Sequence, residues 1–163
     1  MTDRRILIVD DELSVRGSLE EWFKEDGFLV ETAEDGQAAL RAMERGPYDI
    51  VLLDLKMPGM DGISVQKRVR EIDPGATIII LTAYASVQTA VEALKLGAFD
   101  YVTKPVDPDD LSNLVRNALR TRALTEENVR LKEKVTELTE STPILAVSPA
   151  MEHVLEMVRT VAE

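Results

Sequence analysis

Cysteine is absent from this 163-residue sequence, and histidine occurs only once. The absence of cysteine excludes disulfide bonds and thiolate metal sites, and it is typical of a reducing compartment. Basic residues are also few, because 19 lysines and arginines stand against 30 aspartates and glutamates and leave a net charge of -11. Nucleic-acid binding depends on a basic surface, so we expect no direct nucleic-acid contact by this chain.

Long apolar runs are missing as well, although 45% of the residues are hydrophobic. No segment is long enough to span a bilayer, and the N-terminus lacks the apolar stretch of a signal peptide. The sequence also lacks a phosphate-binding loop of the form Gly-x-x-x-x-Gly-Lys, so it predicts no ATPase activity. We therefore expect a soluble cytoplasmic protein that makes no membrane contact and is not an enzyme with an external substrate.

Short apolar runs rich in β-branched residues alternate with helical patterns over the first two-thirds of the chain. Strands are predicted at residues 5–9, 28–33, 48–54, 77–82 and 100–103, with helices between them at residues 14–25, 37–45, 63–72 and 86–96. This alternation, with right-handed crossovers, predicts an α/β fold with a doubly wound, five-stranded parallel sheet.

Residues 111–140 contain neither glycine nor proline, which allows one extended C-terminal helix. The second half of this helix carries a heptad pattern that predicts a parallel coiled-coil dimer. Its d positions are Leu124, Leu131 and Leu138, and its a positions are Asn128 and Val135. A solvated amphipathic helix is the alternative interpretation of the same residues.

The distribution of apolar residues, glycine and proline along the sequence predicts three parts. Residues 1–121 form the globular domain, and residues 122–140 form a coiled-coil linker that continues its last helix. Residues 141–163 hold a further linker and one short amphipathic helix, which is not stable alone. We therefore expect that last part to be the start of another domain.

Five polar residues directly follow the apolar runs of the predicted strands. They are Asp10, Asp11, Asp54, Thr82 and Lys104. Because parallel strands place their carboxyl ends at one edge of the sheet, these side chains should converge there. Carboxylates suit Mg²⁺, a lysine pairs with phosphate oxygens, and an aspartate can accept a phosphoryl group as an acyl phosphate. The set predicts a phosphoryl-accepting pocket with Asp54 as the nucleophile.

In this order and spacing, the segments 6–12, 54–62, 82–85 and 101–105 resemble the receiver domain of two-component response regulators. The resemblance covers roughly residues 3–121. It implies a flavodoxin-like sheet with strand order 2-1-3-4-5, and a phosphoryl group taken by Asp54 from the phosphohistidine of a sensor histidine kinase. It also implies Mg²⁺ bound by Asp10, Asp11, Asp54 and the backbone carbonyl of Lys56.

The same resemblance implies roles for residues around the pocket. Lys104 and Thr82 would contact the phosphoryl group, and the Lys104–Pro105 peptide bond would be cis. Tyr101 would be a switch residue that moves inward when Thr82 is drawn to the phosphate. From sequence alone, a half-buried strand tyrosine is an equally good interpretation of Tyr101.

Residues 82–93 and 97–101 are most similar to the receivers of NtrC-type regulators. Those proteins continue into a linker helix and an AAA+ ATPase that activates sigma-54 RNA polymerase. The resemblance implies that residues 148–163 begin this ATPase domain, and that contact with the polymerase belongs to domains outside this chain. It also fits a homodimer formed by the linker coiled coil together with a receiver face that carries Leu114 and Ala118.

Two other functions are compatible with an acidic pocket. One is a Mg²⁺-dependent phosphatase that forms an aspartyl phosphate, and the other is a dimerisation module with a vestigial pocket. Such a phosphatase usually has a second acid two residues after the nucleophile, where this chain has Lys56. Turnover of a phosphate ester would favour the phosphatase, and one stable phosphate per chain would favour a signalling switch.

Overall fold

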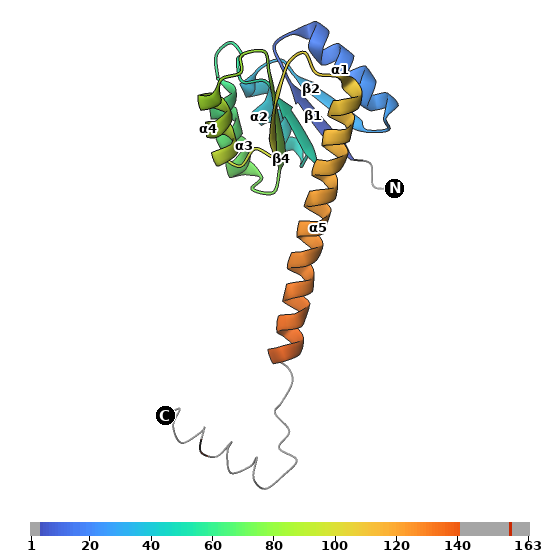
Figure 1. Ribbon diagram of the computed structural model, residues 1–163, viewed down its shortest axis with the longest axis vertical. Coiled ribbons are helices and arrows are strands. Elements are labelled where there is room, and N and C mark those ends of the chain that lie inside the picture. The colour runs from blue at the N-terminus through green and yellow to red at the C-terminus, as the bar shows by residue number, and fades with distance from the viewer. Residues whose placement is uncertain (1–3, 141–156, 158–163) are drawn as a thin grey trace. The chain divides into compact units, whose positions relative to one another are not determined.

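The computed structural model describes residues 4–140 and residue 157. Strands and helices alternate along it (Figure 1). The strands are β1 (Arg5–Val9), β2 (Leu29–Ala33), β3 (Ile50–Leu53), β4 (Thr77–Thr82) and β5 (Asp100–Thr103). The helices are α1 (Leu13–Glu25), α2 (Gly36–Arg45), α3 (Gly62–Ile72), α4 (Val87–Lys95) and α5 (Pro108–Glu140).

The five strands form one parallel sheet in the order β2-β1-β3-β4-β5, which confirms the predicted fold. The sheet changes its winding direction where β1 lies beside β3. The register pairs Val9 with Leu53, so the residues that follow these two strands emerge next to each other. In open α/β sheets this edge, outside the carboxyl ends of the strands, is where sites form.

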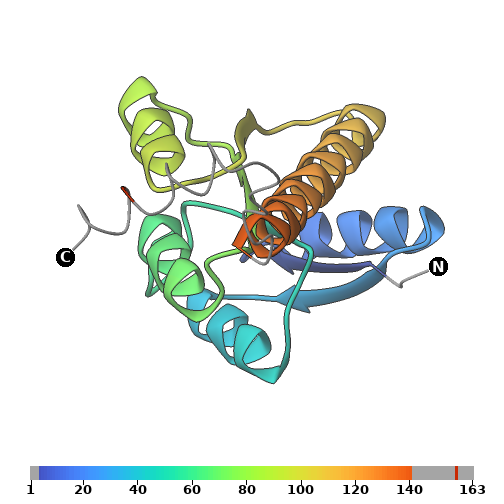
Figure 2. The ribbon, with the colours of Figure 1, turned by 90° about the horizontal axis from the view of Figure 1, so that it is seen from below.

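Helices cover both faces of the sheet (Figure 2). Helices α1 and α5 pack on one face, where Phe23, Leu111 and Val115 are fully buried against β1, β3 and β4. Helices α2, α3 and α4 contribute to the core on the other face. Because both faces are buried, the central strands read as continuous apolar runs rather than as an alternating pattern.

Side-chain caps set the beginnings of several helices. Asp35 accepts a hydrogen bond from the Ala38 amide at 2.7 Å and starts α2, and Asp61 accepts one from the Ser64 amide at 2.9 Å and starts α3. Ser86 starts α4 through a capping box with Thr89. These residues satisfy amides that have no partner within the helix.

The chain divides after Ala123 into two units, Met1–Ala123 and Leu124–Glu163, so the division falls inside α5. The three-part organisation into residues 1–121, 122–140 and 141–163 stays a prediction. Its last part, including the predicted start of an ATPase domain, lies outside the described residues except for Met157. Within the described part of the chain, no helix is both long and apolar enough to cross a membrane.

Candidate functional site

Three carboxylates meet at the carboxyl edge of the sheet. Asp10 and Asp11 follow β1 and Asp54 follows β3, and each offers a carboxylate oxygen within 4.8 Å of the others. Asp10 and Asp54 are 2% and 5% exposed, whereas Asp11 is open to solvent. A hydrogen bond of 2.9 Å from the Asp54 amide to the Val9 carbonyl continues the β1–β3 ladder and fixes this neighbourhood.

The Lys104 ammonium joins the two buried carboxylates. Its Nζ lies 2.5 Å from Asp10 Oδ2 and 2.7 Å from Asp54 Oδ2. Burial by itself would lower the pKa of Lys104, but the hydrogen bonds and charges of Asp10 and Asp54 outweigh it and raise the pKa. Lys104 follows β5 directly, and its peptide bond to Pro105 is cis. The lysine is therefore a fixed cation at the centre of the acidic cluster.

The second oxygen of each buried carboxylate is held by the backbone. Asp10 Oδ1 accepts a hydrogen bond from the Glu12 amide, and Asp54 Oδ1 accepts one from the Lys56 amide, both at 3.0 Å. Each carboxylate thus has one oxygen on a peptide N–H and the other on Lys104. This arrangement fixes the orientation of both groups, which a nucleophile or a metal ligand requires.

Thr82 ends the adjacent strand β4 and is fully buried. Its Oγ1 accepts a hydrogen bond of 3.2 Å from the Tyr84 amide, and its carbonyl accepts one of 2.9 Å from the Lys104 amide. The hydroxyl hydrogen has no partner in these contacts, so Thr82 keeps a donor for an additional group. Thr82 therefore belongs to the same edge of the sheet as the acidic cluster.

Tyr101 lies on β5 and is half-buried. Its hydroxyl is 3.0 Å from Thr89 Oγ1 in the first turn of α4. This contact connects the edge strand to the helix that follows Thr82 in the chain. The structure gives one position of Tyr101, and the movement implied by the resemblance stays a prediction.

The predicted dimer residues lie on α5. Leu124, Leu131 and Val135 are 58%, 53% and 60% exposed, and Asn128 is also exposed. The side chain of Leu138 lies outside the described set. These exposures describe a single chain, and the coiled coil stays a prediction.

Sequence reasoning missed two cationic side chains near the pocket. Arg16 of α1 donates a hydrogen bond of 2.6 Å from Nη1 to the Asp10 carbonyl. The Lys56 ammonium lies 3.6 Å from the centre of the Tyr84 ring, in cation–π contact between the β3–α3 and β4–α4 loops. An arginine six residues after Asp10, in an otherwise acidic segment, was the available signal for the first contact. The second contact had no sequence signal.

Gly62 was also missed as a site residue. A Cβ atom at this position would lie 2.3 Å from the Asp54 carbonyl oxygen and 2.5 Å from Leu55 Cα. The Gly62 amide donates a hydrogen bond of 2.8 Å to the Leu55 carbonyl. The start of α3 is therefore packed directly onto the backbone of the central carboxylate, and only glycine fits there.

The donor set suits a hard divalent cation. Carboxylate and carbonyl oxygens are the protein ligands that Mg²⁺ prefers, together with water and phosphate oxygens. Asp10, Asp11 and Asp54 bring such oxygens together within the described residues, while Asp11 faces solvent and leaves an approach for an ion. The residues therefore fit a small metal ion beside Asp54.

A family model for the response regulator receiver domain matches residues 6–116. The regulatory protein AtoC of Escherichia coli is 44% identical over 147 residues, which are 90% of this chain and 32% of AtoC. The transcriptional regulatory protein ZraR of Escherichia coli K12 is 37% identical over 158 residues, covering 96% of this chain and 34% of ZraR. The chain thus spans about a third of the length of these relatives.

Solved structures agree with this comparison. The response regulator TrrA of Thermotoga maritima, in complex with Mg²⁺ and BeF, is 38% identical with a TM-score of 0.65 and covers 71% of this chain and 98% of its own. NtrX of Brucella abortus, in complex with ADP, is 27% identical with a TM-score of 0.71 and covers 99% of this chain and 34% of its own. With the matching family model and this fold, the chain belongs to the response regulator receiver family of two-component signalling systems.

Proposed function

We propose that Asp54 is the residue of this receiver that accepts the phosphoryl group from a phosphohistidine of a sensor histidine kinase. The observation that carries the proposal is that Lys104 lies between Asp10 and Asp54, with its ammonium 2.7 Å from Asp54 Oδ2. An Asp54 oxygen attacks phosphorus, the P–N bond to the imidazole breaks, and the imidazole leaves with the bonding electron pair. The products are an acyl phosphate on Asp54 and a free histidine.

Positive charge must face the transferring group, because negative charge spreads over its equatorial oxygens. Lys104 supplies a fixed positive charge, and the Thr82 hydroxyl supplies a hydrogen-bond donor. We assign Mg²⁺ to Asp10, Asp11, Asp54 and the backbone carbonyl of Lys56. When bound, this ion neutralises charge on the phosphoryl oxygens and on the carboxylates.

Intact mass after incubation with Mg²⁺ and acetyl phosphate tests the assignment of Asp54. The parent should gain one phosphate, and Asp54→Asn should gain none because the amide is not a nucleophile. Asp61→Asn is a matched control, since asparagine also caps a helix and Asp61 lies in the loop after Asp54. Equal labelling of Asp54→Asn would refute the assignment, and catalytic turnover of the donor without a stable adduct would favour the phosphatase.

Magnesium binding can be tested apart from phosphorylation. Asp11 is the exposed carboxylate and has no share in the Lys104 ion pairs, so it is the most available ligand. Asp11→Ala should therefore weaken Mg²⁺ binding by about tenfold or more in calorimetry, a loss in the range known for altered metal sites. Parent-like affinity would remove Asp11 from the metal site.

The proposal extends to the longer protein that the relatives represent. ZraR is a transcriptional regulatory protein, and NtrX has a solved complex with ADP. We infer the organisation described above: a receiver at residues 1–121, a linker helix at 122–140, and the start of an AAA+ ATPase domain at 141–163. In this organisation the phosphorylated receiver controls a sigma-54-dependent activator through a homodimer.

A further inference from the structure

The two ends of helix α4 are held in different ways. At the C-terminal end, the buried Gln66 amide donates a hydrogen bond of 2.9 Å to the Ala93 carbonyl, and Arg70 donates one to the Gly97 carbonyl. Arg70 also donates a hydrogen bond of 2.7 Å to Pro74 at the end of α3. Gly97 has a φ of +89°, and a Cβ there would lie 3.3 Å from Arg70. Helix α3 therefore fixes the C-terminal end of α4 through side chains packed at close range.

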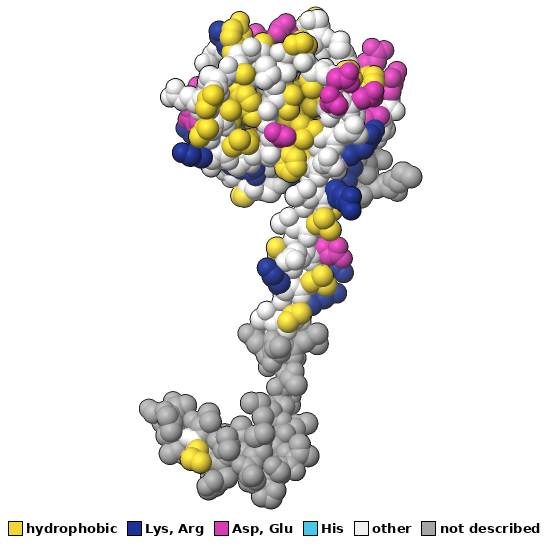
Figure 3. All heavy atoms as spheres, in the orientation of Figure 1, with side chains coloured by type: hydrophobic (Ala, Val, Ile, Leu, Met, Phe, Trp, Pro, Cys, Tyr) yellow, Lys and Arg dark blue, Asp and Glu magenta, His cyan; other side chains and the backbone are white. Residues whose placement is uncertain are grey.

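The N-terminal end of α4 depends on hydroxyl groups. Ser86 Oγ accepts a hydrogen bond of 3.1 Å from the Thr89 amide, and Thr89 Oγ1 accepts one of 3.3 Å from the Ser86 amide. Thr89 Oγ1 also lies 3.0 Å from the Tyr101 hydroxyl. Val87 in this turn is 84% exposed, so apolar burial contributes little there. Apolar side chains are visible on this exposed side of α4 in Figure 3.

The Thr89 hydroxyl is shared between the helix cap and Tyr101. A threonine hydroxyl donates one hydrogen bond and accepts two. Thr89 Oγ1 contacts the Ser86 carbonyl at 3.1 Å, the Ser86 amide at 3.3 Å and Ser86 Oγ at 2.9 Å, and it shares its remaining hydrogen-bonding capacity with the Tyr101 hydroxyl at 3.0 Å. The Tyr101 hydroxyl is thereby held toward α4 in this arrangement.

We propose that Thr89 is a positioning residue that holds Tyr101 in the resting position and opposes the phosphorylated state. The inference rests on the proposed function, phosphorylation of Asp54, and on the predicted inward movement of Tyr101 in the phosphorylated state. Because α3 fixes the far end of α4, the helix cannot follow Tyr101 as a rigid body, and the Thr89–Tyr101 hydrogen bond breaks. Thermodynamic linkage then requires that breaking this bond beforehand strengthens binding of the phosphoryl group.

Thr89→Val tests the inference, because valine keeps the shape of threonine and lacks the hydroxyl. The dissociation constant for beryllofluoride in the presence of Mg²⁺ should fall by about two- to tenfold, which corresponds to one net hydrogen bond. Thr89→Ser keeps the hydroxyl and should bind as the parent does. Ser86→Ala removes the cap side chain and leaves the Tyr101 contact, so its dissociation constant should equal or exceed that of the parent.

Fluorotyrosine labelling gives a second measurement on the same variants. The chain has three tyrosines, and Tyr101→Phe identifies the ¹⁹F signal of Tyr101. In Thr89→Val without beryllofluoride, this signal should shift toward its position in the bound parent, while Ser86→Ala should leave it in place. If Thr89→Val changes neither the affinity for beryllofluoride nor the ¹⁹F signal, the role of Thr89 is overturned and the proposed function is not affected. A parent that does not bind beryllofluoride would overturn the proposed function as well.

Discussion

At the scale of single residues, the charge of the pocket explains its chemistry. Three formal negative charges on Asp10, Asp11 and Asp54 stand against one positive charge on Lys104, which leaves two negative charges. A divalent cation neutralises these two negative charges. Without it, an incoming phosphoryl group would be repelled by the negative charge of the pocket. The positive charge of Lys104 pairs with the two buried carboxylates. It is not enough to make the pocket attract a negatively charged phosphoryl group.

Tyr48 should make the free energy of unfolding depend on pH in the alkaline range. Burial, followed by the hydrogen bond that its hydroxyl donates to Glu31, raises the pKa of Tyr48 to about 12 from 10.0. Between these values the folded state keeps a proton that the unfolded state releases, so the free energy of unfolding falls as pH rises through this window. The loss should be on the order of 2 kcal/mol. Urea unfolding at several pH values should show a smaller decline in Tyr48→Phe, and an equal decline in both proteins would contradict the prediction.

Two glycines provide opposite tests of local packing. Gly62→Ala places a methyl group against the backbone of Asp54 and Leu55, so it should destabilise the fold by roughly 1–3 kcal/mol and slow phosphorylation. Gly17 lies within α1, and a Cβ there would meet no atom within 4 Å beyond its chain neighbours and the adjacent backbone of its own helix. Gly17→Ala should therefore stabilise the fold by about 0.5–1 kcal/mol, because alanine favours the helix. Thermal unfolding and acetyl phosphate labelling of both variants test whether the close contact of Gly62 with the Asp54 backbone is needed for stability and for phosphorylation.

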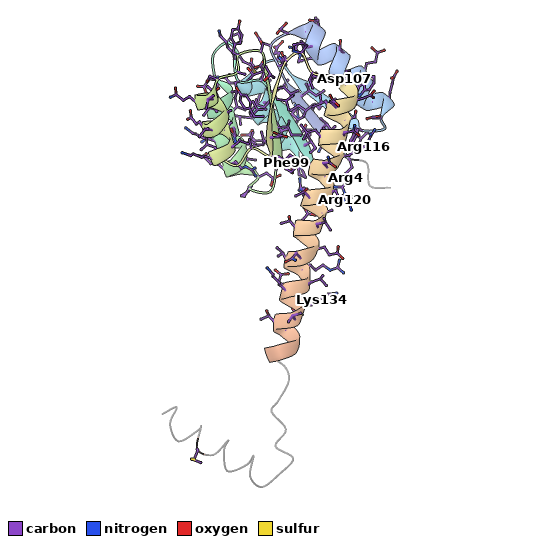
Figure 4. All side chains as sticks on the ribbon, viewed as in Figure 1. Arg4, Phe99, Asp107, Arg116, Arg120 and Lys134 are labelled. Atoms are coloured by element: carbon purple, nitrogen blue, oxygen red, sulfur yellow. The ribbon has the colours of Figure 1, made fainter. Side chains whose placement is uncertain are left out.

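At the scale of secondary-structure elements, a partly buried chain of polar side chains joins α1 to α5. Trp22 Nε1 donates to Ser112 Oγ, and Ser112 Oγ donates to Asp26 Oδ2, both at 2.8 Å. Arg116, labelled on α5 in Figure 4, also pairs with Asp26 at 3.0 Å. Ser112 is 2% exposed, so water cannot easily replace the hydrogen bonds of its hydroxyl if the side chain is removed.

Ser112→Ala should lower the free energy of unfolding by about 1–2 kcal/mol, because it leaves the half-buried Trp22 indole N–H without its acceptor. Trp22 is the only tryptophan, so its fluorescence emission should shift in the same variant. Asn113→Ala changes the exposed neighbouring position and serves as the control. It should change the free energy of unfolding by no more than about 0.5 kcal/mol and leave the emission of Trp22 nearly unchanged. Equal stability of the two variants would mean that the α1–α5 contact depends on apolar packing alone.

The sequence predicts the elements well because their signals are local. The apolar runs at residues 5–9, 77–82 and 100–103 match the observed strands, and the sheet order follows the resemblance. The strand predicted at residues 48–54 is shorter, Ile50–Leu53. Asp49 precedes it; its amide donates to the Arg5 carbonyl at 2.9 Å, and its carboxylate accepts the Arg5 amide at 2.8 Å and pairs with Arg4 at 2.7 Å.

The contacts that connect elements were much less predictable. The charged residues at strand ends point to a common edge, since strand topology alone places them there. Gln66 and Thr89 carry no such signal, because the contact that matters for each reaches a residue on another element: Gln66 bonds to Ala93, and Thr89 bonds to Tyr101. Their roles depend on the packing of α4 against α3 and β5, which periodicity does not encode.

At the scale of the whole molecule, the proposed output requires a second copy of the chain. The exposed residues Leu124, Leu131 and Val135 are spaced as a coiled-coil seam requires. Two heptads are marginal alone, and the expected help from a receiver face carrying Leu114 and Ala118 is wrong for Ala118, which is 1% exposed and packs in the core of its own chain. Asn128 at an a position would lower stability and favour a parallel, aligned pair, because two asparagines can then satisfy each other.

Sedimentation equilibrium can test this dimer with a small set of variants. The parent should be a dimer at tens of micromolar, and a chain truncated after Thr121 should dissociate more readily because it lacks the seam. Asn128→Leu should tighten association and admit trimers or tetramers, since an apolar a position no longer selects two strands. Glu133→Gln, at a solvent-facing f position of the same heptads, is the matched control and should leave the association unchanged. A parent that stays monomeric at this concentration would refute the coiled coil, and residues 122–140 would then be a solvated amphipathic helix.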